Sequence, residues 1–444
     1  MFKSFRGGIH PKDSKSYSEN SPIEIGPIPK KVIIPLRQHI GAMATPIVKK
    51  GDTVKKGQLI GHSEGFVSSN IHSSVCGIVL DVCEYNNGTF GKCLAVIIES
   101  DESDEWIEGI PLQRNIEELT NKEMKEIVQS LGVVGMGGAT FPTHVKLSPG
   151  DTKVIDTLIL NGAECEPYLT ADYRVMIEMS DKVIKGTILT MKMLNVKKAY
   201  IGIEDNKPEA IEKMKQSVAN NKEEGFSINV VALPTKYPQG AEKMLIKVLT
   251  GREVPSGGLP TDVKVIVQNV GTVAAIYDAI VSGIPLIERV TTVSGGAIKN
   301  PKNLLLRVGT TFEEAINCCG GLNEEAKKII MGGPMMGFAQ YTLDIPIVKG
   351  TSGILALTEK EVNQSKEYPC IRCGKCVEAC PMGLVPSMLG ILAENNAFLE
   401  AKEDYNLLDC VECGSCAYTC PAKRKLVQSI RYNKLQCTLL SNKK

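Results

Sequence analysis

Two segments carry the same cysteine pattern: residues 370–381 read CIRCGKCVEACP, and residues 410–421 read CVECGSCAYTCP. Each cysteine of the first segment has a counterpart 40 positions later, so the segments form an internal repeat. The spacing Cys-x2-Cys-x2-Cys-x3-Cys-Pro is the one by which thiolates enclose a cubane [4Fe–4S] cluster. The sequence therefore predicts a domain with two such clusters, and the apolar spacing over 385–408 predicts helices between the repeats.

The fourth cysteine of each repeat indicates how the clusters are held. It stands after a three-residue gap and before a proline, and in two-cluster ferredoxins this cysteine binds the cluster of the other repeat. A zinc site of Cys-x2-Cys pairs, or a chance grouping of structural thiols, leaves the fourth cysteine without a role. We therefore predict two sets of ligands: Cys370, Cys373, Cys376 and Cys420 for the first cluster, and Cys410, Cys413, Cys416 and Cys380 for the second.

The composition is that of a globular chain with several domains. Its 444 residues favour two to four domains. Lys and Arg number 51 and Asp and Glu 50, and the resulting net charge of +1 gives no electrostatic reason to expect a nucleic-acid partner. No run of about eighteen apolar residues could span a bilayer. Fifteen cysteines in so long a chain favour metal ligation over a disulfide scaffold.

Residues 30–110 alternate short β-rich runs with turns, which predicts a small all-β module. The stretch 51–61 followed by 71–79 resembles the barrel-sandwich fold of lipoyl and biotinyl carriers. Where a carrier presents its modified lysine this chain has Phe66, so we expect an unmodified module. The Met-Lys-Met tripeptide of biotin carriers does occur at 191–193, but it lies in a run with helical spacing.

Residues 115–285 alternate helical and strand patterns, which predicts an α/β sheet. Ligands of such sheets bind at loops beyond the carboxyl ends of the strands. Three loops carry suitable groups: the glycine-rich segment 132–143, the segment 161–167 with an amide and two carboxylates, and the segment 268–272 with two amides. Glycines let backbone N–H groups approach a phosphate, although such loops are also common tight turns. The glycine-rich segment follows a predicted helix, so a Rossmann fingerprint is not supported.

Together with the cysteine repeat, these loops resemble the flavin- and NADH-binding subunit of respiratory complex I and of related NAD-linked hydrogenases. That family has Gly-Arg-Gly-Gly-Ala-Gly-Phe-Pro-Thr and a lysine where this chain has 135–143 and Lys146, with Met136 replacing the arginine and Thr140 a glycine. The family's Asn-x-x-Glu-x-Glu-Pro motif matches 161–167. Its Asn-Asn-Val-x-Thr motif matches 268–272, with glutamine in the first position.

The resemblance implies that these loops bind FMN and stack NADH over it. The expected cofactor-binding residues are Gly135, Gly137, Gly138, Phe141, Lys146, Asn161, Glu164, Glu166, Asn206, Gln268 and Asn269. We expect Glu164 and Glu166 to shape the electrostatics of the nucleotide pocket; the alternative is that they cap a helix near Tyr168. NADH releases two electrons together and a cluster accepts one at a time, so a flavin between them would connect the parts.

A narrower resemblance, to the RnfC family of the Rnf complex, spans almost all of the chain and includes 5–11, 38–41, 64–67 and 410–423. It implies a multidomain α/β and β fold. The expected divisions are an amino-terminal segment at 1–29, a barrel-sandwich module at 30–110, a complex-I-flavoprotein-like α/β domain at 111–285, a β-grasp-like soluble-ligand-binding domain at 286–348, and a helical two-cluster ferredoxin domain at 349–444.

The same resemblance implies an NADH dehydrogenase-type oxidoreductase with non-covalent FMN, two [4Fe–4S] clusters and NAD(H) as substrate. In that family electron exchange between ferredoxin and NAD is coupled to Na⁺ or H⁺ movement. The expected partners are membrane subunits and a ferredoxin-like iron–sulfur subunit, and the expected place is the cytoplasmic face of the cell membrane. Two alternatives stay open: a soluble NADH-dependent cobalamin reductase of a microcompartment, and an iron–sulfur adaptor without flavin.

Overall fold

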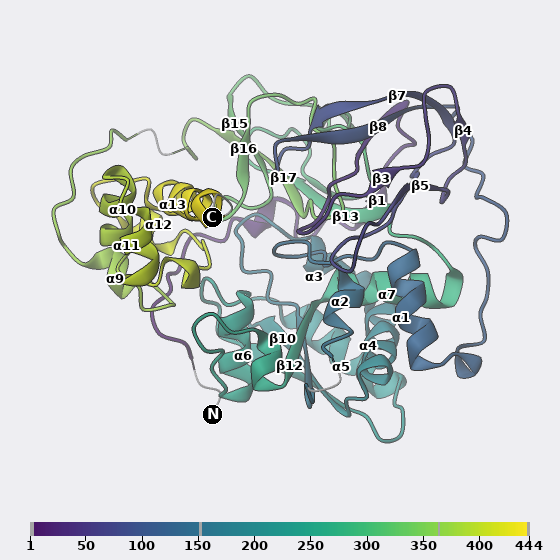
Figure 1. The fold of residues 1–444 in the computed structure, drawn as a ribbon, viewed down its shortest axis with the longest axis horizontal. Helices are drawn as coiled ribbons and strands as arrows, with labels where there is room; N and C mark the ends of the chain where they lie inside the picture. The colour runs from purple at the N-terminus through teal and green to yellow at the C-terminus, as the bar shows by residue number, and fades with distance from the viewer. Residues whose placement is uncertain (1–3, 151–152, 363–364, 442–444) are drawn as a thin grey trace.

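The computed structural model describes residues 4–150, 153–362 and 365–441, which fold into four connected parts (Figure 1). In this view a two-sheet β module and a six-stranded mixed sheet lie at the top, and a parallel α/β domain lies below them. A helical domain with both cysteine repeats lies to the left. The mixed α/β and β architecture predicted from the sequence is confirmed at this level.

The β module consists of two antiparallel sheets around a shared core. Its strands are β2 (Lys31–Pro35), β3 (Thr45–Pro46), β4 (Thr53–Val54), β5 (Leu59–His62), β6 (Ile71–His72), β7 (Gly77–Asn86) and β8 (Lys92–Ser100). One sheet has the order β2-β8-β7-β4 and the other β3-β5-β6. Branched residues such as Val32, Ile34 and Ile60 fill the space between them, since such side chains fit a pleated, half-buried surface. Phe66 lies between β5 and β6 with an exposed side chain.

The α/β domain is built on a four-stranded parallel sheet in the order β11-β10-β9-β12. Its strands are β9 (Thr157–Asn161), β10 (Lys198–Glu204), β11 (Ser227–Leu233) and β12 (Val265–Asn269). Its helices are η2 (Ile116–Glu118), α1 (Asn121–Ser130), α2 (Thr143–Lys146), α3 (Ala171–Glu178), α4 (Ser180–Leu194), α5 (Pro208–Asn220), α6 (Glu242–Thr250), η3 (Pro260–Val263) and α7 (Val270–Ser282).

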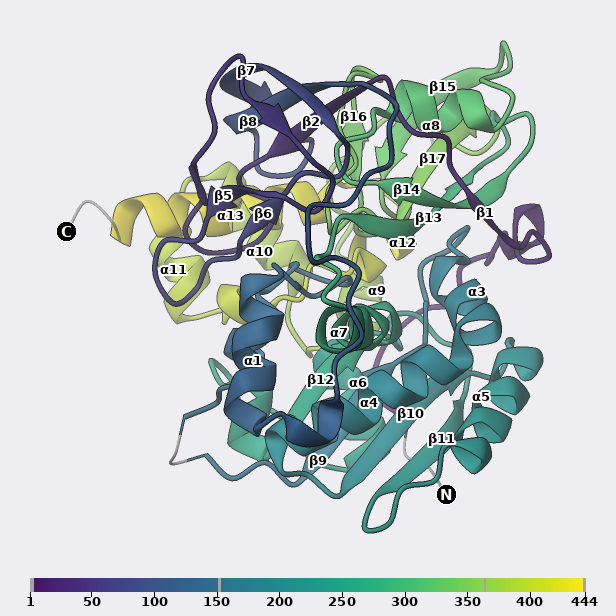
Figure 2. The same cartoon turned by 90° about the vertical axis from the view of Figure 1, so that its right-hand side faces the viewer.

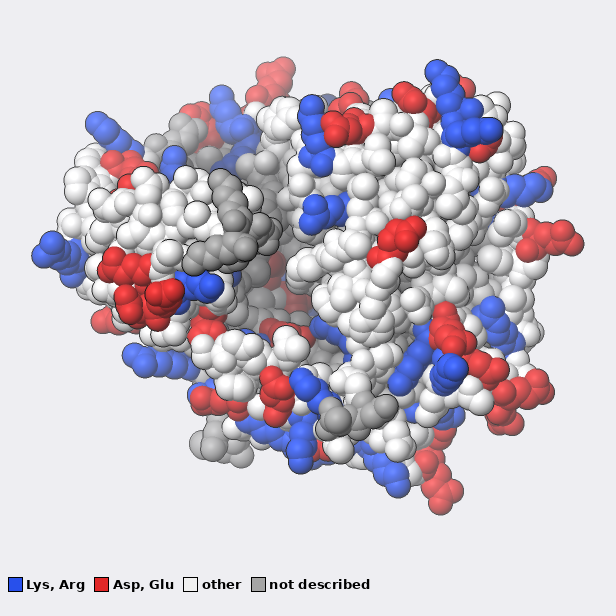
Figure 3. Space-filling model, in the orientation of Figure 1, with Lys and Arg blue, Asp and Glu red and all other residues white. Residues whose placement is uncertain are grey.

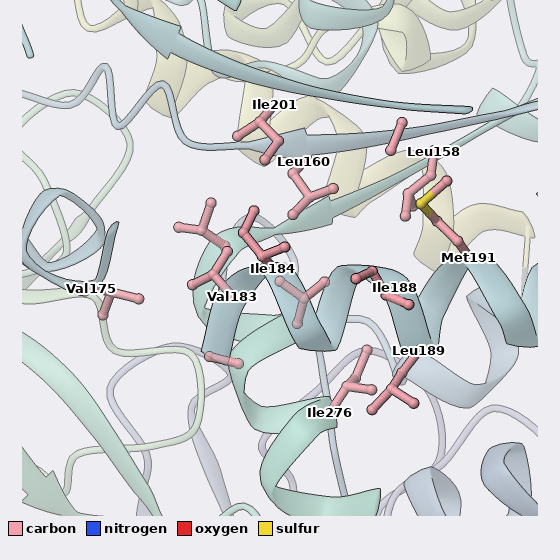
Figure 4. Packing of buried hydrophobic residues seen from close by; sticks show 14 of the residues in the cluster. Leu158, Leu160, Val175, Val183, Ile184, Ile188, Leu189, Met191, Ile201 and Ile276 are labelled. Carbon is pink, nitrogen blue, oxygen red and sulfur yellow. The ribbon is translucent and has the colours of Figure 1, made fainter. Parts of the chain in front are cut away.

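Helices cover both faces of this sheet, as Figure 2 shows for α4, α5 and α7 in front of it. Alternate residues of one strand serve opposite faces: Leu158 and Leu160 contact the α4 side, whereas Ile159 contacts α6. Figure 4 shows Ile184, Ile188 and other side chains of α4 pointing at the strands. Burying each such side chain stabilises the fold by roughly 2 kcal/mol.

The six-stranded sheet has the order β1-β14-β13-β17-β15-β16. Its elements are β1 (Ile23–Ile25), β13 (Glu288–Ser294), β14 (Lys302–Arg307), α8 (Phe312–Cys318), β15 (Ala326–Met331), β16 (Phe338–Gln340) and β17 (Gly353–Thr358). Two of its strands come from outside the stretch 286–348 that the sequence assigns to this domain. The fully buried β17 lies between β13 and β15, and β1 pairs with β14 after a short helix, η1 (Lys15–Tyr17).

The cysteine repeats lie in a domain of short helices, as the spacing of apolar residues over 385–408 predicts. Its helices are α9 (Lys375–Glu378), α10 (Pro386–Glu394), α11 (Phe398–Glu403), η4 (Leu407–Asp409), α12 (Ser415–Thr419) and α13 (Leu426–Ser441). The long helix α13 lies against α10 and α11 and closes the domain. Among the described residues, no helix combines the length and apolar character that a bilayer span needs.

Charges of both signs are interspersed over the face of the molecule in Figure 3, and a hollow separates the cysteine domain from the rest. Neither positive nor negative side chains dominate this face, which agrees with the net charge of +1. This face therefore carries no broad basic patch of the kind that binds nucleic acid.

Three parts of the molecule meet around the buried side chain of Lys349. Its Nζ donates hydrogen bonds to the carbonyl oxygens of Asn70 in the β module (2.8 Å) and Gly132 in the α/β domain (2.7 Å). Its backbone N–H donates to Oε1 of Gln38 (2.9 Å). Burial of the ammonium lowers the pKa of Lys349 to about 7.

We predict that the substitution Lys349→Met changes the pH dependence of stability. Above about pH 7 the folded protein holds Lys349 neutral, while the unfolded chain keeps its proton up to the ordinary pKa of 10.5. The unfolded state then binds more protons, so this group adds stability to the wild type as pH rises through that window. Relative to Lys349→Met, the unfolding free energy of the wild type should increase by about 1.4 kcal/mol per pH unit. Urea unfolding between pH 7 and 10 measures it, and a difference independent of pH would contradict it.

Candidate cofactor sites

Two asparagines stand side by side at the carboxyl edge of the parallel sheet. Asn161 ends β9 and Asn269 ends β12, and the two are register partners. Asn161 Nδ2 donates to the carbonyl of Gly240 (2.8 Å), and Asn269 Oδ1 accepts the N–H of Gly271 (2.8 Å) at the start of α7. Backbone groups therefore fix both amides at the edge where parallel sheets bind their ligands.

The glycine-rich loop passes over Asn269 and is fastened through the backbone of Met136. The N–H of Met136 donates to Oγ1 of Thr272 (2.9 Å), and its carbonyl accepts from Nη2 of Arg289 (3.1 Å). A Cβ added to Gly137 would lie 3.6 Å from Cβ of Asn269. The first and third loops predicted from the sequence are thus in contact.

Arg289 is a buried cation that sequence reasoning missed. It lies on β13, and its Nη1 also donates to the carbonyl of Lys349 (2.7 Å). Burial lowers the pKa of Arg289 to about 10, while the charge of Asp172 acts in the opposite direction. Asp172 in turn accepts a hydrogen bond from Nδ2 of Asn269 (2.6 Å). One arginine within a strand of buried Val and Thr residues is the signal that could have marked it.

The space around this edge suits a bound flavin nucleotide. Gly137 has an ordinary backbone φ, and its added Cβ would touch nothing closer than 3.6 Å, so the fold by itself does not require glycine there. Gly138 has a φ of +61° and open space above it. The buried Nε2 of Gln268 has no hydrogen-bond partner among the described residues. An open glycine cradle lets backbone N–H groups approach phosphate or ring atoms closely.

Glu164 and Glu166 hold loops together through backbone N–H groups. Glu164 accepts from the N–H groups of Asp172 (2.7 Å) and Tyr173 (3.2 Å), so it caps the start of α3, as the alternative interpretation foresaw. Glu166 accepts from the N–H groups of Met335 (3.0 Å) and Met336 (2.9 Å). Desolvation raises the pKa of each glutamate to about 7, because these hydrogen bonds only partly offset the loss of water.

Lys15, which no sequence pattern marked, fastens the loop that carries these glutamates. Its Nζ donates to the carbonyl oxygens of Glu164 (2.9 Å), Glu166 (3.1 Å) and Leu169 (2.6 Å). The side chain is buried, and this burial lowers its pKa. An ammonium group can donate three hydrogen bonds, and all three go to this one loop.

The other predicted cofactor residues have partners within the chain. Lys146 is bound to Glu242 of α6 (2.9 Å) and to the carbonyl of Val267 (3.2 Å). Asn206 follows β10 at the same edge of the sheet, is exposed, and accepts from Nζ of Lys207 (3.0 Å). The carbonyl of Phe141 accepts the N–H of Gly135 (2.8 Å), and this hydrogen bond joins the two sides of the glycine-rich loop. Lys146 would reach a nucleotide only by rearranging or sharing its contacts, whereas the contact of Phe141 is made by its backbone and that of Asn206 by Oδ1 alone.

The eight repeat cysteines surround two separate cavities. One, of about 860 Å³ including its opening to solvent, is lined by Cys370, Cys373, Cys376 and Cys420. The other, of about 350 Å³, is lined by Cys380, Cys410, Cys413 and Cys416. The thiols line cavities rather than converge on a point: within the described ranges, no three His, Cys, Asp or Glu side chains are close enough to hold a single ion. Each cavity therefore takes three cysteines from one repeat and the fourth from the other.

The two repeats have matching local geometry. Arg372 and Glu412 both have positive φ, at 55° and 56°, and each directs its N–H to the sulfur of the cysteine two residues before it, at 3.4 Å. Such N–H groups stabilise sulfur that carries negative charge. Burial raises the pKa of Cys410 to about 11, so this thiol needs a cation to become a thiolate at neutral pH. The donor set fits an iron–sulfur cluster.

The two cavities differ in exposure. Cys373 of the first set is exposed, and its neighbours Ile371 and Tyr368 are 66% and 57% exposed. In the second set Cys380, Cys413 and Cys416 are all at most 8% exposed. The first cavity thus lies at the surface of the cysteine domain, and the second lies inside the molecule.

Family models match most of the chain in four successive segments. The RnfC barrel-sandwich hybrid domain matches residues 3–103, the Nuo51 FMN-binding domain 128–278, the SLBB domain 290–339, and the 4Fe-4S dicluster domain 369–423. The chain thus has domains for FMN and for two [4Fe–4S] clusters, which the sites above suit. These matches fit the predicted types of domain.

Solved structures with a similar fold include an NAD⁺-reducing [NiFe]-hydrogenase. Its H₂-reduced form has a TM-score of 0.50 at 16% identity over 71% of this chain and 63% of that chain. Its air-oxidised form has a TM-score of 0.51 at 15% identity over 72% and 64%. This chain spans just under two thirds of the hydrogenase chain, and at such identity the likeness concerns the fold alone.

Three curated relatives are similar over nearly the whole chain, and each is the C subunit of its complex. That of the proton-translocating ferredoxin:NAD⁺ oxidoreductase complex of Clostridium ljungdahlii is 66% identical over 98% of this chain and 94% of its own. The Na⁺-translocating counterpart of Acetobacterium woodii is 48% identical over 97% and 96%. That of the ion-translocating oxidoreductase complex of Rhodobacter capsulatus is 44% identical over 97% and 82%. The chain therefore belongs to the RnfC family of ion-translocating ferredoxin:NAD⁺ oxidoreductase complexes.

Proposed function

We propose that this chain is the NAD(H)-reactive electron-transfer subunit of an Rnf-type complex, exchanging electrons between NAD(H) and ferredoxin-linked partner subunits. The observation that carries the proposal is the presence, in one chain, of an open glycine cradle at a sheet edge and two four-cysteine cavities. Residues of both regions share one buried cluster, which contains Tyr237, Ala379 and Cys413 and against which Cys165 packs. The complexes of two named relatives are proton-translocating and Na⁺-translocating, so either ion is compatible with the family.

Bound FMN supplies the conversion between the electron pair of a hydride and the single electrons of clusters. In this proposal the N–H groups of Gly137 and Gly138 hold the nucleotide, Gly135 lets the loop approach it closely, and the amides of Asn161 and Asn269 border it. Gln268, whose Nε2 lacks a partner among the described residues, contributes a donor. Glu164, Glu166 and Lys15 fix the adjoining loop. Phe141 and Asn206 complete the pocket, together with Lys146 after it exchanges its present contacts.

The clusters are proposed to have crossed ligation. Cys370, Cys373, Cys376 and Cys420 hold the first, and Cys410, Cys413, Cys416 and Cys380 hold the second, as the lining of the two cavities suggests. The exposed apolar residues Ile371 and Tyr368 beside Cys373 suit a docked iron–sulfur partner, because electron transfer requires close approach. The remaining partners are membrane subunits, with this chain bound peripherally at the cytoplasmic face. We also propose that residues 286–348 belong to a β-grasp-like domain.

The function is tested by NADH titration of anaerobic holoprotein. We expect one FMN and about eight iron atoms per chain. NADH should bleach the flavin and then the clusters, because electrons must pass through the flavin. Zinc in place of iron, clusters without flavin, or efficient corrinoid reduction by the isolated chain would contradict the proposal and favour one of the alternatives.

The flavin site is tested by Gly137→Ala. Its added methyl group has room in the fold but projects over the amide edge, so it should clash with the nucleotide rather than with the protein. We expect FMN affinity to fall about tenfold or more, corresponding to at least 1.4 kcal/mol, with an unchanged melting temperature. Fluorescence titration of apoprotein with FMN measures the affinity. If the variant bound FMN as tightly as the wild type, the glycine cradle would not be part of the flavin site.

Crossed ligation is tested with pairs of cysteine variants and iron analysis. Cys420→Ala should lose about half of the iron. Adding Cys370→Ala should remove no more, because both residues serve the same cluster, whereas adding Cys410→Ala should remove the rest. The reverse order of losses would show ligation within each repeat. Cys437→Ser, a buried cysteine of the same domain outside both sets, should keep all of the iron.

A further inference from the structure

One tyrosine hydroxyl joins the glutamate loop of the α/β domain to the second cysteine set. Tyr237 Oη lies 2.7 Å from the carbonyl oxygen of Cys413 and 3.2 Å from Oε1 of Glu166. The side chain of Tyr237 is only 2% exposed, so water does not replace either contact. Three residues thus form a direct path from the loop after β9 to a cysteine loop.

A second contact reinforces this path. Glu166 also accepts the N–H groups of Met335 and Met336. The carbonyl of Met335 lies against Gly414, where an added Cβ would come within 2.9 Å of it. The peptide of Cys413 and Gly414 is therefore bordered on two sides by groups that the carboxyl group of Glu166 holds.

The amino-terminal segment also holds the loop of Cys380, the cysteine of the first repeat that lines the second cavity. Ile9 pairs with Tyr237 through two backbone hydrogen bonds of 2.9 Å. One residue earlier, the N–H of Gly8 donates to the carbonyl of Ala379 (2.9 Å). Gly7 adopts a φ of +67° and lies so close to the carbonyl of Cys380 that a Cβ would come within 2.6 Å of it. Cys413 and Cys380, which line one cavity from different repeats, are thus both secured to the layer around Tyr237.

The hydroxyl of Tyr237 has one hydrogen but two acceptors. An ionised Glu166 and the Cys413 carbonyl compete for it, whereas a protonated Glu166 can donate to Oη while Oη donates to Cys413. Burial raises the pKa of Glu166 to about 7, which favours the arrangement with both hydrogen bonds. A glutamine at this position would also provide that donor.

We propose that Tyr237 and Glu166 are positioning residues that lock the second cysteine set against the flavin side of the molecule. The cluster of Cys410, Cys413, Cys416 and Cys380 is then the one that exchanges electrons directly with the flavin, and the exposed first cluster faces the partner. This inference rests on the proposed function. Electron transfer slows steeply with distance, and hydrogen bonds around the ligands tune cluster potentials, so a fixed junction affects both rate and potential.

The test is Tyr237→Phe in the anaerobic holoprotein, since this change removes one oxygen and keeps the ring in its buried place. After rapid mixing with NADH, flavin reduction should keep its wild-type rate and cluster reduction should slow severalfold, because the junction that fixes the distance and the potential of the second cluster is loosened. Chemical reduction provides a readout independent of NADH: the paramagnetic signal of one cluster should change its shape or midpoint potential, and the other should not.

Two further variants sharpen this test. Tyr168→Phe is the matched control, because it also removes a tyrosine hydroxyl from this region. That hydroxyl donates to Glu361 (3.0 Å) and not to a cysteine loop. It should leave both readouts at wild-type values. Glu166→Gln should keep more of the cluster reduction rate than Glu166→Ala, because glutamine can donate to Tyr237 and accept the Met335 N–H while giving up only the bond from the Met336 N–H.

The possible failures are distinct. Wild-type cluster reduction and wild-type cluster signals in Tyr237→Phe would overturn the positioning role. A changed signal confined to the cluster that survives in Cys410→Ala would overturn the assignment of the inner cluster to the flavin side. Failure of NADH to reduce the flavin of the wild type would instead overturn the proposed function, while the chemically reduced signals would still decide whether Tyr237 acts on the second cluster.

Discussion

Three buried basic side chains hold the loops of the candidate sites in place. Lys15, Arg289 and Lys349 each donate to backbone carbonyls of segments distant in sequence, and burial lowers the pKa of each. Loops rich in glycine have little side-chain surface with which to pack, so their carbonyl oxygens are the available anchoring points. Removing one of these side chains would leave several buried acceptors unpaired. The free energy of unfolding would then fall by more than it does when a surface hydrogen bond is lost.

These anchors make the sites a property of the whole chain. The glycine-rich loop is held by an arginine of the six-stranded sheet, and the glutamate loop by a lysine of the amino-terminal segment. The segment around Gly7 and Ile9 then continues to the cysteine domain. Parts that the sequence divides into separate modules thus share hydrogen bonds at the places where cofactors are proposed to bind, and a flavin and two clusters can keep a fixed arrangement only in such an assembly.

The sequence was sufficient wherever the information is local. Cysteine spacing within each repeat predicts three of the four thiols that line each cavity, and the ferredoxin pattern predicts the fourth. The alternation of helical and strand patterns predicts an α/β sheet, and Asn161 and Asn269 lie at its carboxyl edge. It was insufficient where a contact joins distant segments. Nothing near Lys15, Tyr237 or Arg289 indicates their partners, and the entry of β1 and β17 into one sheet depends on pairing between distant strands. Glu164 matched a motif, yet its carboxyl group caps α3.

The crossed lining of the two cavities has a consequence for how the protein is made. The cavity of Cys370, Cys373 and Cys376 is completed by Cys420, and that of Cys410, Cys413 and Cys416 by Cys380. While the chain emerges from the ribosome, the first repeat appears well before the second and can offer only incomplete sets of thiols. Neither cavity exists until Cys420 has been synthesised and the domain has folded. Under the proposed crossed ligation, delivery of iron and sulfide therefore follows translation of both repeats, and a chain interrupted between them would mature neither centre.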